Sequence, residues 1–360
     1  MDRLPPETFR LPVDKLRAGY YSDAYFTSTK GLLEAEGRHP RVVLQSFQKH
    51  DALLGGIDEA LAILRDCAGR AGPHGWDPGW DALEVRALFE GDDIVPREPV
   101  LQIAGDYGLF CHLETVILGT MARRTLVMRN VREVVEAARG KPILYFPARH
   151  DHWLVQTGDG WAAHVAGAIG VSTDAQASWW GGRGIGTVPH GLIAAYGGDT
   201  VAAARAFAGR FARDTNVTVL VDWDNDSVGT ALAVAEALGD DLWGVRLDTS
   251  EALVDRALEG VEAVDRDGIR GVNARLVRTV RDALDAAGHG RVRIVASGGF
   301  DAERIRAFEA ATVPVDAYGV GSSLIRGQND FTADVVRVDG RPCAKAGRGE
   351  QSAERLTRVR

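Results

Sequence analysis

The chain has 360 residues, 45% of them hydrophobic and 26% charged, with a formal net charge of −8. At about 150 residues per domain, this length predicts two domains, each with a sizeable core. The modest charge on a hydrophobic-rich chain excludes disorder as the main state. The chain has no run of about 18 uncharged apolar residues, which disfavours a transmembrane helix. The first residues contain no apolar signal core, which disfavours secretion.

The cysteines are few and scattered. Cys67, Cys111 and Cys343 are odd in number and form no CxxC pair. They disfavour a disulfide framework and a cysteine zinc site, and they fit a reducing cytoplasm. The balance of 42 basic against 50 acidic residues argues against a nucleic-acid partner. A small anionic substrate remains open, because one local positive pocket is enough to bind it.

The first part of the chain mixes short strands and helices without a simple period. We expect a strand at 42–47, an amphipathic helix at 58–64, a turn-rich surface loop at 69–80, a strand at 100–104 and a long helix at 113–138. This mixture predicts a smaller α+β domain over residues 1–139.

After residue 140, short apolar runs alternate with helical patterns, which predicts parallel strands joined by crossover helices. Five or more such units favour an irregular, partly open α/β barrel, TIM-like, over residues 140–327. The final stretch carries a strand pair around Asp339-Gly340, and we expect residues 328–360 to complete the N-terminal domain. The expected barrel strands are 142–146, 217–221, 242–247, 292–296 and 315–320, and the expected helices are 200–212, 228–238, 273–287 and 302–311.

Two turns of small residues follow the last two barrel strands. One is Ser297-Gly298-Gly299 and the other runs from Gly319 to Ser323. Functional groups of a parallel barrel lie at the carboxyl ends of its strands. Backbone N–H groups are exposed at such turns, and a following helix favours an anion there. Either turn alone could simply be a tight turn, but the pair predicts a phosphate site.

Charged residues follow two other strands. Arg246 and Asp248 are two apart and share a strand face, where they could bind an anion and a ribose. The alternative is a structural salt bridge or a helix cap. Asp222 and Asp224 stand in an acidic turn that suits Mg²⁺ carrying a diphosphate. The alternative there is a solvated acidic loop in which Asp226 or Ser227 caps the next helix.

Two further strand ends carry candidate groups. His190 lies in the Gly/Pro-bounded turn Gly186-Thr187-Val188-Pro189-His190 and could be a base, an anion ligand or a nucleophile toward phosphate. A lone histidine is more often structural. Phe146 and Arg149 could hold an aromatic carboxylate by stacking and by a bidentate ion pair. His150 and His152 have no third ligand near them in sequence, which disfavours a metal site.

Together these elements resemble the nicotinate phosphoribosyltransferase family, in the type II phosphoribosyltransferase fold. The likeness covers nearly the whole chain in the right order, and the tail from Phe331 to Lys345 also looks like the family's ending. The family stretches T-D-x-Y, F-G-L-R, G-T-x-x-H, R-x-D-S/T, S-G-G and G-V-G-[ST]-S are matched by Ser22–Tyr25, Phe146–Arg149, Gly186–His190, Arg246–Thr249, Ser297–Gly299 and Gly319–Ser323.

The resemblance implies a role for each matched residue. Phosphoribosyl pyrophosphate would place its 5-phosphate on the two glycine turns, with Mg²⁺ bridging the diphosphate. Tyr25 of a second subunit would stack on the pyridine ring opposite Phe146, so a homodimer or higher homo-oligomer is expected. His190 would correspond to the histidine that ATP phosphorylates in ATP-coupled members. The expected catalytic residues are His190, Asp248 and Arg246, the substrate-binding residues are Tyr25, Asp23, Phe146, Arg149, Thr187, Asp222, Ser297, Gly298, Gly299, Gly319, Gly321 and Ser322, and the metal ligands are Asp222 and Asp224.

The implied activity is transfer of phosphoribose to nicotinate in NAD biosynthesis or salvage, yielding nicotinate mononucleotide and pyrophosphate, with ATP coupling possible. Quinolinate or another pyridine acid is the alternative substrate on the same fold, although a second carboxylate calls for a richer Arg/Lys cluster. A non-catalytic phosphosugar-binding module is the alternative of another class, disfavoured because buried polar clusters cost stability without a ligand. A lysine-dependent aldolase is disfavoured because residues 142–327 contain no lysine.

Overall fold

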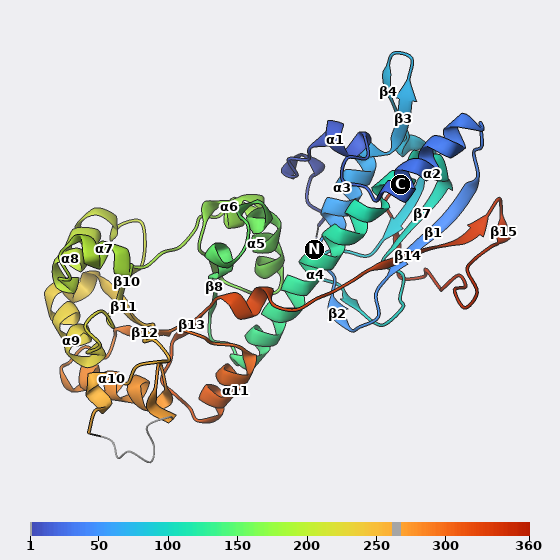
Figure 1. Cartoon of the computed structure of the whole chain (residues 1–360). Helices are drawn as coiled ribbons and strands as arrows, with labels where there is room; N and C mark the ends of the chain where they lie inside the picture. The colour runs from blue at the N-terminus through green and yellow to red at the C-terminus, as the bar shows by residue number, and fades with distance from the viewer. Residues whose placement is uncertain (1, 261–267) are drawn as a thin grey trace. The chain divides into compact units, whose positions relative to one another are not determined.

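The computed structural model describes residues 2–260 and 268–360, and the chain divides into two compact units (Figure 1). Unit 1 comprises Met1–Arg129 with Gly327–Arg360, and unit 2 comprises Asn130–Arg326. The first boundary falls inside the long helix α4 (Glu114–Ala137), earlier than the boundary after residue 139 that the sequence suggests.

Unit 1 is built on a six-stranded antiparallel sheet. Strand β14 pairs with β1 from Val42↔Val338 to Phe47↔Thr332, so the C-terminal tail joins the N-terminal sheet, as the sequence predicts. Inward and outward residues alternate along β7, which gives the sheet one core face. The strand order is β15 (Arg341–Pro342), β14 (Thr332–Val338), β1 (Arg41–Phe47), β7 (Leu101–Asp106), β5 (Glu84–Ala87) and β16 (Thr357–Arg358).

Helix α3 (Ile57–Cys67) supplies much of the core of unit 1. Its buried residues include Ile63 and Leu64, which belong to the same apolar cluster as Leu44 and Ile103 of the sheet. This unit also contains α1 (Val13–Arg17), α2 (Ala24–Ala35), β2 (Ala52–Leu53) and β6 (Asp93–Ile94).

The expected loop at 69–80 is wrong. Strands β3 (Gly69–Gly72) and β4 (Gly75–Pro78) form an antiparallel hairpin that projects from unit 1 (Figure 1). Its strands are mostly Gly, Ala, Asp and Pro around a single tryptophan, so they lack the β-branched residues by which strands are identified. The two strands pair on either side of a two-residue turn at Pro73-His74.

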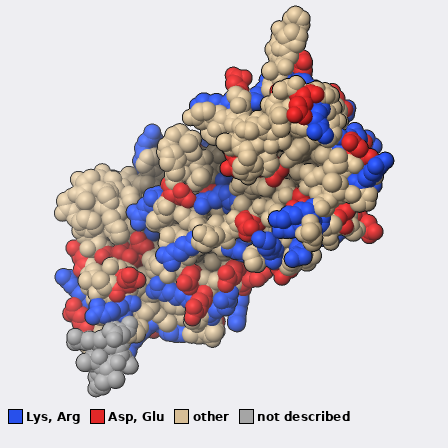
Figure 2. Space-filling view, turned by 45° about the vertical axis from the view of Figure 1, so that its right-hand side comes forward, with Lys and Arg blue, Asp and Glu red and all other residues tan. Residues whose placement is uncertain are grey.

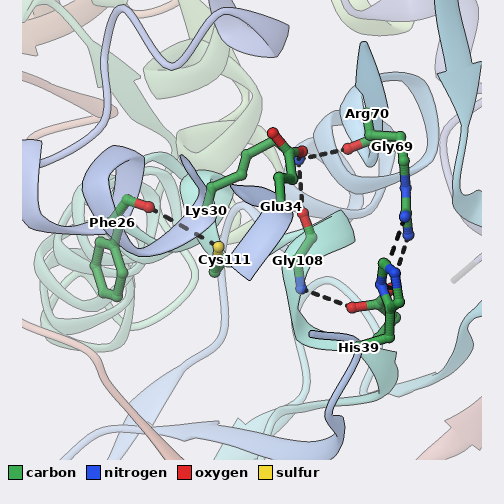
Figure 3. Close-up of polar contacts among 9 residues, drawn as sticks. Phe26, Lys30, Glu34, His39, Gly69, Arg70, Gly108 and Cys111 are labelled. Carbon is green, nitrogen blue, oxygen red and sulfur yellow. Dashed lines mark hydrogen bonds and ion pairs between the residues drawn. The ribbon is translucent and has the colours of Figure 1, made fainter. Parts of the chain in front are cut away.

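Helix α2 is held to unit 1 largely by one buried ammonium group. The helix has no fully buried residue. Lys30 of α2, with a side chain only 12% exposed, donates to the carbonyl oxygens of Gly69 at 2.7 Å and Gly108 at 2.6 Å, and its Nζ lies 3.1 Å from Glu34 Oε1 (Figure 3). Hydrogen bonds from a charged donor are stronger than neutral ones. Lys30 therefore anchors the helix whose first turn carries Tyr25.

Replacing this anchor should loosen α2. Lys30→Met leaves the two buried carbonyl groups without their charged donor, and we expect a loss of about 2–3 kcal/mol in the free energy of unfolding. Urea denaturation would measure this loss, and amide hydrogen exchange would show faster opening of Ala24–Ala35. The control is Lys49→Met, because Lys49 forms an exposed ion pair with Asp330, at 3.6 Å, which should contribute little to stability. Equal midpoints for the two variants would contradict the anchoring role.

Unit 2 contains a six-stranded parallel sheet that curls into a partly open barrel, as the sequence predicts. The first strand, β8, pairs with the last, β13, and the edge strands β9 and β10 are not paired with each other. A bridge between Val188 and Val219 extends the β10 edge. The strand order is β10 (Val217–Leu220), β11 (Leu242–Leu247), β12 (Arg293–Ala296), β13 (Ala317–Val320), β8 (Ile143–Tyr145) and β9 (Gly170–Val171).

Helices flank this sheet between its strands (Figure 1). The expected helices are present within one or two residues of their predicted ends, because each combines a capping side chain with an apolar stripe. Asp199, Asp226, Asn273 and Asp301 accept backbone N–H groups at four of the N-termini. The helices are α5 (Gln156–Val165), α6 (Asp174–Ala177), α7 (His190–Ala195), α8 (Thr200–Phe211), α9 (Ser227–Leu238), α10 (Ala274–Ala286) and α11 (Ala302–Ala310).

Positive and negative side chains are interspersed over the face drawn in Figure 2. None of the helices within residues 2–260 and 268–360 combines the length and apolar character that a membrane span requires.

Candidate active site

A cavity of about 580 Å³ lies at the carboxyl ends of the strands of unit 2. All of the unit 2 residues predicted for catalysis or substrate binding, except Asp222, line it. They are Phe146, Arg149, Thr187, His190, Arg246, Asp248, Ser297, Gly298, Gly299, Gly319, Gly321 and Ser322.

The guanidinium group of Arg246 is fixed from several sides. Its Nε donates to Ser297 Oγ at 2.8 Å, and its Nη2 lies 3.2 Å from Asp248 Oδ2. Ser297 Oγ is also 2.8 Å from Asp248 Oδ1. Because Arg246 of β11 is in register with Val295 of β12, Arg246 and Ser297 lie at the ends of adjacent strands. The network holds one cation at the cavity wall with its carboxylate beside it, so a bound anion finds a preorganised partner.

The two glycine turns form a cradle of backbone donors. Gly298 and Gly299 have φ angles of +85° and +73°, a conformation that favours glycine. The N–H groups of Gly298, Gly299 and Ser322 donate no hydrogen bond to any residue in 2–260 or 268–360. Arg304 holds the first turn by donating to the Gly298 carbonyl at 2.7 Å. Unpaired amides facing a cavity are suited to an oxyanion.

Phe146 forms the apolar wall of the same cavity. A Cβ at Gly319 would stand 2.7 Å from Phe146 Cε2, so the ring can lie against β13 only because residue 319 is glycine. The Arg246 guanidinium lies 5.2 Å from the centre of the ring. Phe146 thus offers a flat surface for an aromatic ligand next to a fixed positive charge.

His190 begins helix α7 and is paired with a buried carboxylate. Its Nε2 lies 2.9 Å from Asp222 Oδ1, and the Asp222 side chain is only 7% exposed. The hydrogen bond to Asp222 raises the pKa of His190. The His190 side chain is itself 42% exposed, so one edge of the ring is held while the rest faces the cavity. This arrangement orients the imidazole for proton transfer or nucleophilic attack.

The predicted metal ligands Asp222 and Asp224 do not share a cavity wall. Asp222 is engaged with His190, whereas Asp224 lines a separate small cavity with Asp226 and Arg256. Among the described residues, no three His, Cys, Asp or Glu side chains are grouped so as to hold a metal ion. The residues present therefore do not fit a resident magnesium ion.

Asp23 and Tyr25 lie in unit 1, at the start of α2. The Tyr25 hydroxyl donates to Asp23 Oδ2 at 3.2 Å, and Thr115 Oγ1 donates to the same oxygen at 2.8 Å. The Tyr25 ring is 62% exposed. The Tyr25 ring is therefore exposed, while its hydroxyl is held by Asp23. That this ring enters the cavity of another subunit stays a prediction.

Sequence reasoning missed some lining residues. His150, Ser172 and Thr173 also face the cavity. His150 could have been found, because it adjoins Arg149 at a strand end. Ser172 and Thr173 follow the two-residue strand β9, which is too short to give a sequence pattern.

A larger cavity, of about 830 Å³, lies toward the amino ends of the same strands. Its walls include Leu144, Val295, Ala317 and Trp243, and the ion pair of Arg293 with Asp316 adjoins it. It contains neither glycine turn and neither His190 nor Arg246. It shares Phe146 and Thr187 with the cavity at the carboxyl ends.

Three comparisons place the chain among known proteins. Residues 23–125 match the family model for the N-terminal domain of quinolinate phosphoribosyl transferase. Nicotinate phosphoribosyltransferase pncB1 of Mycobacterium tuberculosis is 33% identical over 278 residues, which make up 75% of this chain and 57% of that protein. The chain thus spans a little over half the length of this curated relative.

Solved structures cover the chain more completely. Nicotinate-nucleotide pyrophosphorylase from Pyrococcus furiosus is 31% identical, with a TM-score of 0.78, and the match covers 96% of this chain and 82% of that one. Human nicotinic acid phosphoribosyltransferase shares the fold, with a TM-score of 0.68 at 20% identity over 89% of this chain and 75% of that one. The curled parallel sheet is that of a type II phosphoribosyltransferase. Within that class, the chain belongs to the nicotinate phosphoribosyltransferase family.

The pairing of His190 with Asp222 can be tested by titration. Asp222→Asn removes the charged acceptor, so the pKa of His190, now raised, should fall. NMR titration of the His190 ring protons would measure it. The stability that the charged pair contributes is fully present below about pH 6.5, the pKa of histidine in the unfolded chain. It is lost as the pH rises through the raised pKa of His190 in the folded protein. Identical titration curves in the two proteins would contradict the pairing.

Proposed function

We propose that this protein transfers phosphoribose from phosphoribosyl pyrophosphate to nicotinate, forming nicotinate mononucleotide and pyrophosphate for NAD biosynthesis. The observation that carries the proposal is one cavity in which the Arg246–Asp248–Ser297 network faces the unpaired amides of two glycine turns, beside the flat ring of Phe146. Nicotinate phosphoribosyltransferase pncB1 of Mycobacterium tuberculosis and human nicotinic acid phosphoribosyltransferase are named for this activity.

In this proposal each substrate group meets a matching chemical partner. The 5-phosphate lies on the N–H groups of Gly298, Gly299 and Ser322. Asp248 accepts from the ribose hydroxyls, while Arg246 compensates the charge of the diphosphate. The pyridine ring lies on Phe146, and Arg149 pairs with its carboxylate or with a phosphate oxygen.

The chain's residues contribute mainly by positioning and by charge. The C1–pyrophosphate bond breaks, the ribose ring takes up positive charge, and the pyridine nitrogen attacks C1. Asp248 lies on the side where that positive charge develops, and Arg246 stabilises the departing diphosphate. Thr187 Oγ1, 3.4 Å from Arg246 Nη1, limits movement of the guanidinium. Holding both reactants in one cavity removes the entropy cost of their encounter.

His190 is the residue proposed for coupling to ATP. Its ring is oriented by Asp222 and partly exposed to the cavity, which suits a nucleophile that accepts a phosphoryl group and later loses it to water. Asp222 would stabilise the imidazolium formed in this step. In the proposed reaction, magnesium is the counter-ion of the diphosphate substrate.

The free thiols of Cys67, Cys111 and Cys343 support a cytoplasmic location.

Quinolinate is less favoured as substrate. The basic side chains lining the cavity are Arg149, Arg246, His150 and His190. Arg246 is already paired with Asp248 and His190 with Asp222. That leaves Arg149 as the cation best placed for a ring carboxylate, which matches an acid with one carboxylate.

Product formation tests the proposal directly. Incubation of the protein with nicotinate, phosphoribosyl pyrophosphate and Mg²⁺ should yield nicotinate mononucleotide and pyrophosphate. Chromatography would detect these products in reactions with and without ATP. Quinolinate in place of nicotinate should give no product.

His190→Ala should lower or uncouple ATP-dependent turnover. Arg246→Ala should lower kcat/KM at least 100-fold, because it removes a transition-state charge partner. Absence of product under both ATP conditions would overturn the proposal.

A second experiment tests whether Tyr25 completes a neighbour's site. Tyr25→Ala and Arg246→Ala should each be nearly inactive alone. Mixing them by unfolding and refolding should restore about a quarter of the wild-type activity, because half of the dimers then carry one intact composite site. If the mixture stays as inactive as its components, Tyr25 does not act across a subunit boundary.

A further inference from the structure

We propose that His150 is a proton-dependent ligand of the substrate's 5-phosphate: it takes up a proton when the phosphate binds and releases the proton when the phosphate leaves. This inference rests on the proposed function, because it assigns one more residue to the same phosphate site. It makes phosphate affinity a function of pH.

The position of His150 is set by a glycine opposite it. His150 ends the short helix η5 (Pro147–His150), directly after β8, and lines the same cavity as Gly298 and Ser322. A Cβ on Gly321 would stand only 2.9 Å from His150 Cε1. The imidazole therefore rests on the bare backbone of the second glycine turn, next to the unpaired N–H of Ser322.

Two arginines act on the His150 ring. Arg149 precedes it in η5, and Arg326, whose Nη2 donates to Ser322 Oγ at 3.2 Å, follows the second turn. Burial and the positive charges of Arg149 and Arg326 lower the pKa of His150. The other charged groups of this cavity are Arg246 with its partner Asp248, together with His190.

A phosphate bound on the turn would reverse this balance. With no anion present, two arginines disfavour the imidazolium form, so the free protein holds His150 neutral at pH 7. A phosphate dianion on the amides of Gly298, Gly299 and Ser322 places opposite charge beside the ring and favours protonation. The imidazolium can then donate a charge-assisted hydrogen bond to the phosphate. By linkage, binding that takes up a proton weakens as pH rises.

Titration calorimetry with ribose 5-phosphate measures both consequences without requiring catalysis. Binding is recorded between pH 6.5 and 8.5, in buffers of different ionisation heat, so that proton uptake is counted directly. For the wild type we expect net uptake near pH 7.5 and affinity falling up to about tenfold per pH unit. The phosphate's own second ionisation, near pH 6, contributes equally to every variant and cancels in the comparison.

Three variants complete the experiment. His150→Gln should bind more weakly at pH 6.5, with little proton uptake and a flatter pH profile. His150→Arg should keep the affinity but lose the pH dependence, because its charge is permanent. His289→Gln, a matched histidine before the amino end of β12, should behave as the wild type.

The outcomes separate this inference from the proposed function. If His150→Gln shows the same proton uptake and pH profile as the wild type, or if ribose 5-phosphate does not bind, the inference is wrong. If ribose 5-phosphate binds with His150-dependent proton uptake but no nucleotide forms in the product assay, the proposed reaction is wrong and the phosphate ligand stands.

Discussion

Everything in the site depends on one geometric constraint: the parallel strands of unit 2 end at a common edge. Because β11, β12 and β13 are neighbours in register, Arg246, Ser297 and the glycine turn at 319–321 must meet there. The Arg246 guanidinium is then held by Ser297 Oγ and Asp248, and it cannot turn away from the cavity. A fixed cation facing unpaired amides is costly unless an anion binds.

This constraint explains how much could be inferred from sequence. The strands of unit 2 are short apolar runs and its helices begin with capping side chains, so both elements and their order were predictable. Since the carboxyl ends of parallel strands coincide, residues as distant in sequence as Phe146 and Ser322 could be assigned to one cavity. The strand pair around the Asp339-Gly340 turn, β14 with β15, was likewise predictable, whereas the pairing of β14 with β1 was not.

What escaped prediction depends on side-chain direction or on polar anchoring. Asp222 and Asp224 are two apart in an irregular turn, where the alternation of a strand does not hold, so one bonds His190 and the other faces a different cavity. Helix α2 has a weak apolar stripe and is anchored by Lys30, whose carbonyl partners are distant in sequence. The contact of His150 with Gly321 likewise requires both turns to be placed in space.

In the proposed reaction, the glycine turns bind the phosphate of a nucleotide whose ring lies on Phe146. A crystal structure with nicotinate mononucleotide would test this binding mode. We expect phosphate oxygens within hydrogen-bonding distance of the amides of Gly298, Gly299 and Ser322, with the ribose beside Asp248. A phosphate bound in the larger cavity around Trp243, or on any surface away from these amides, would contradict it.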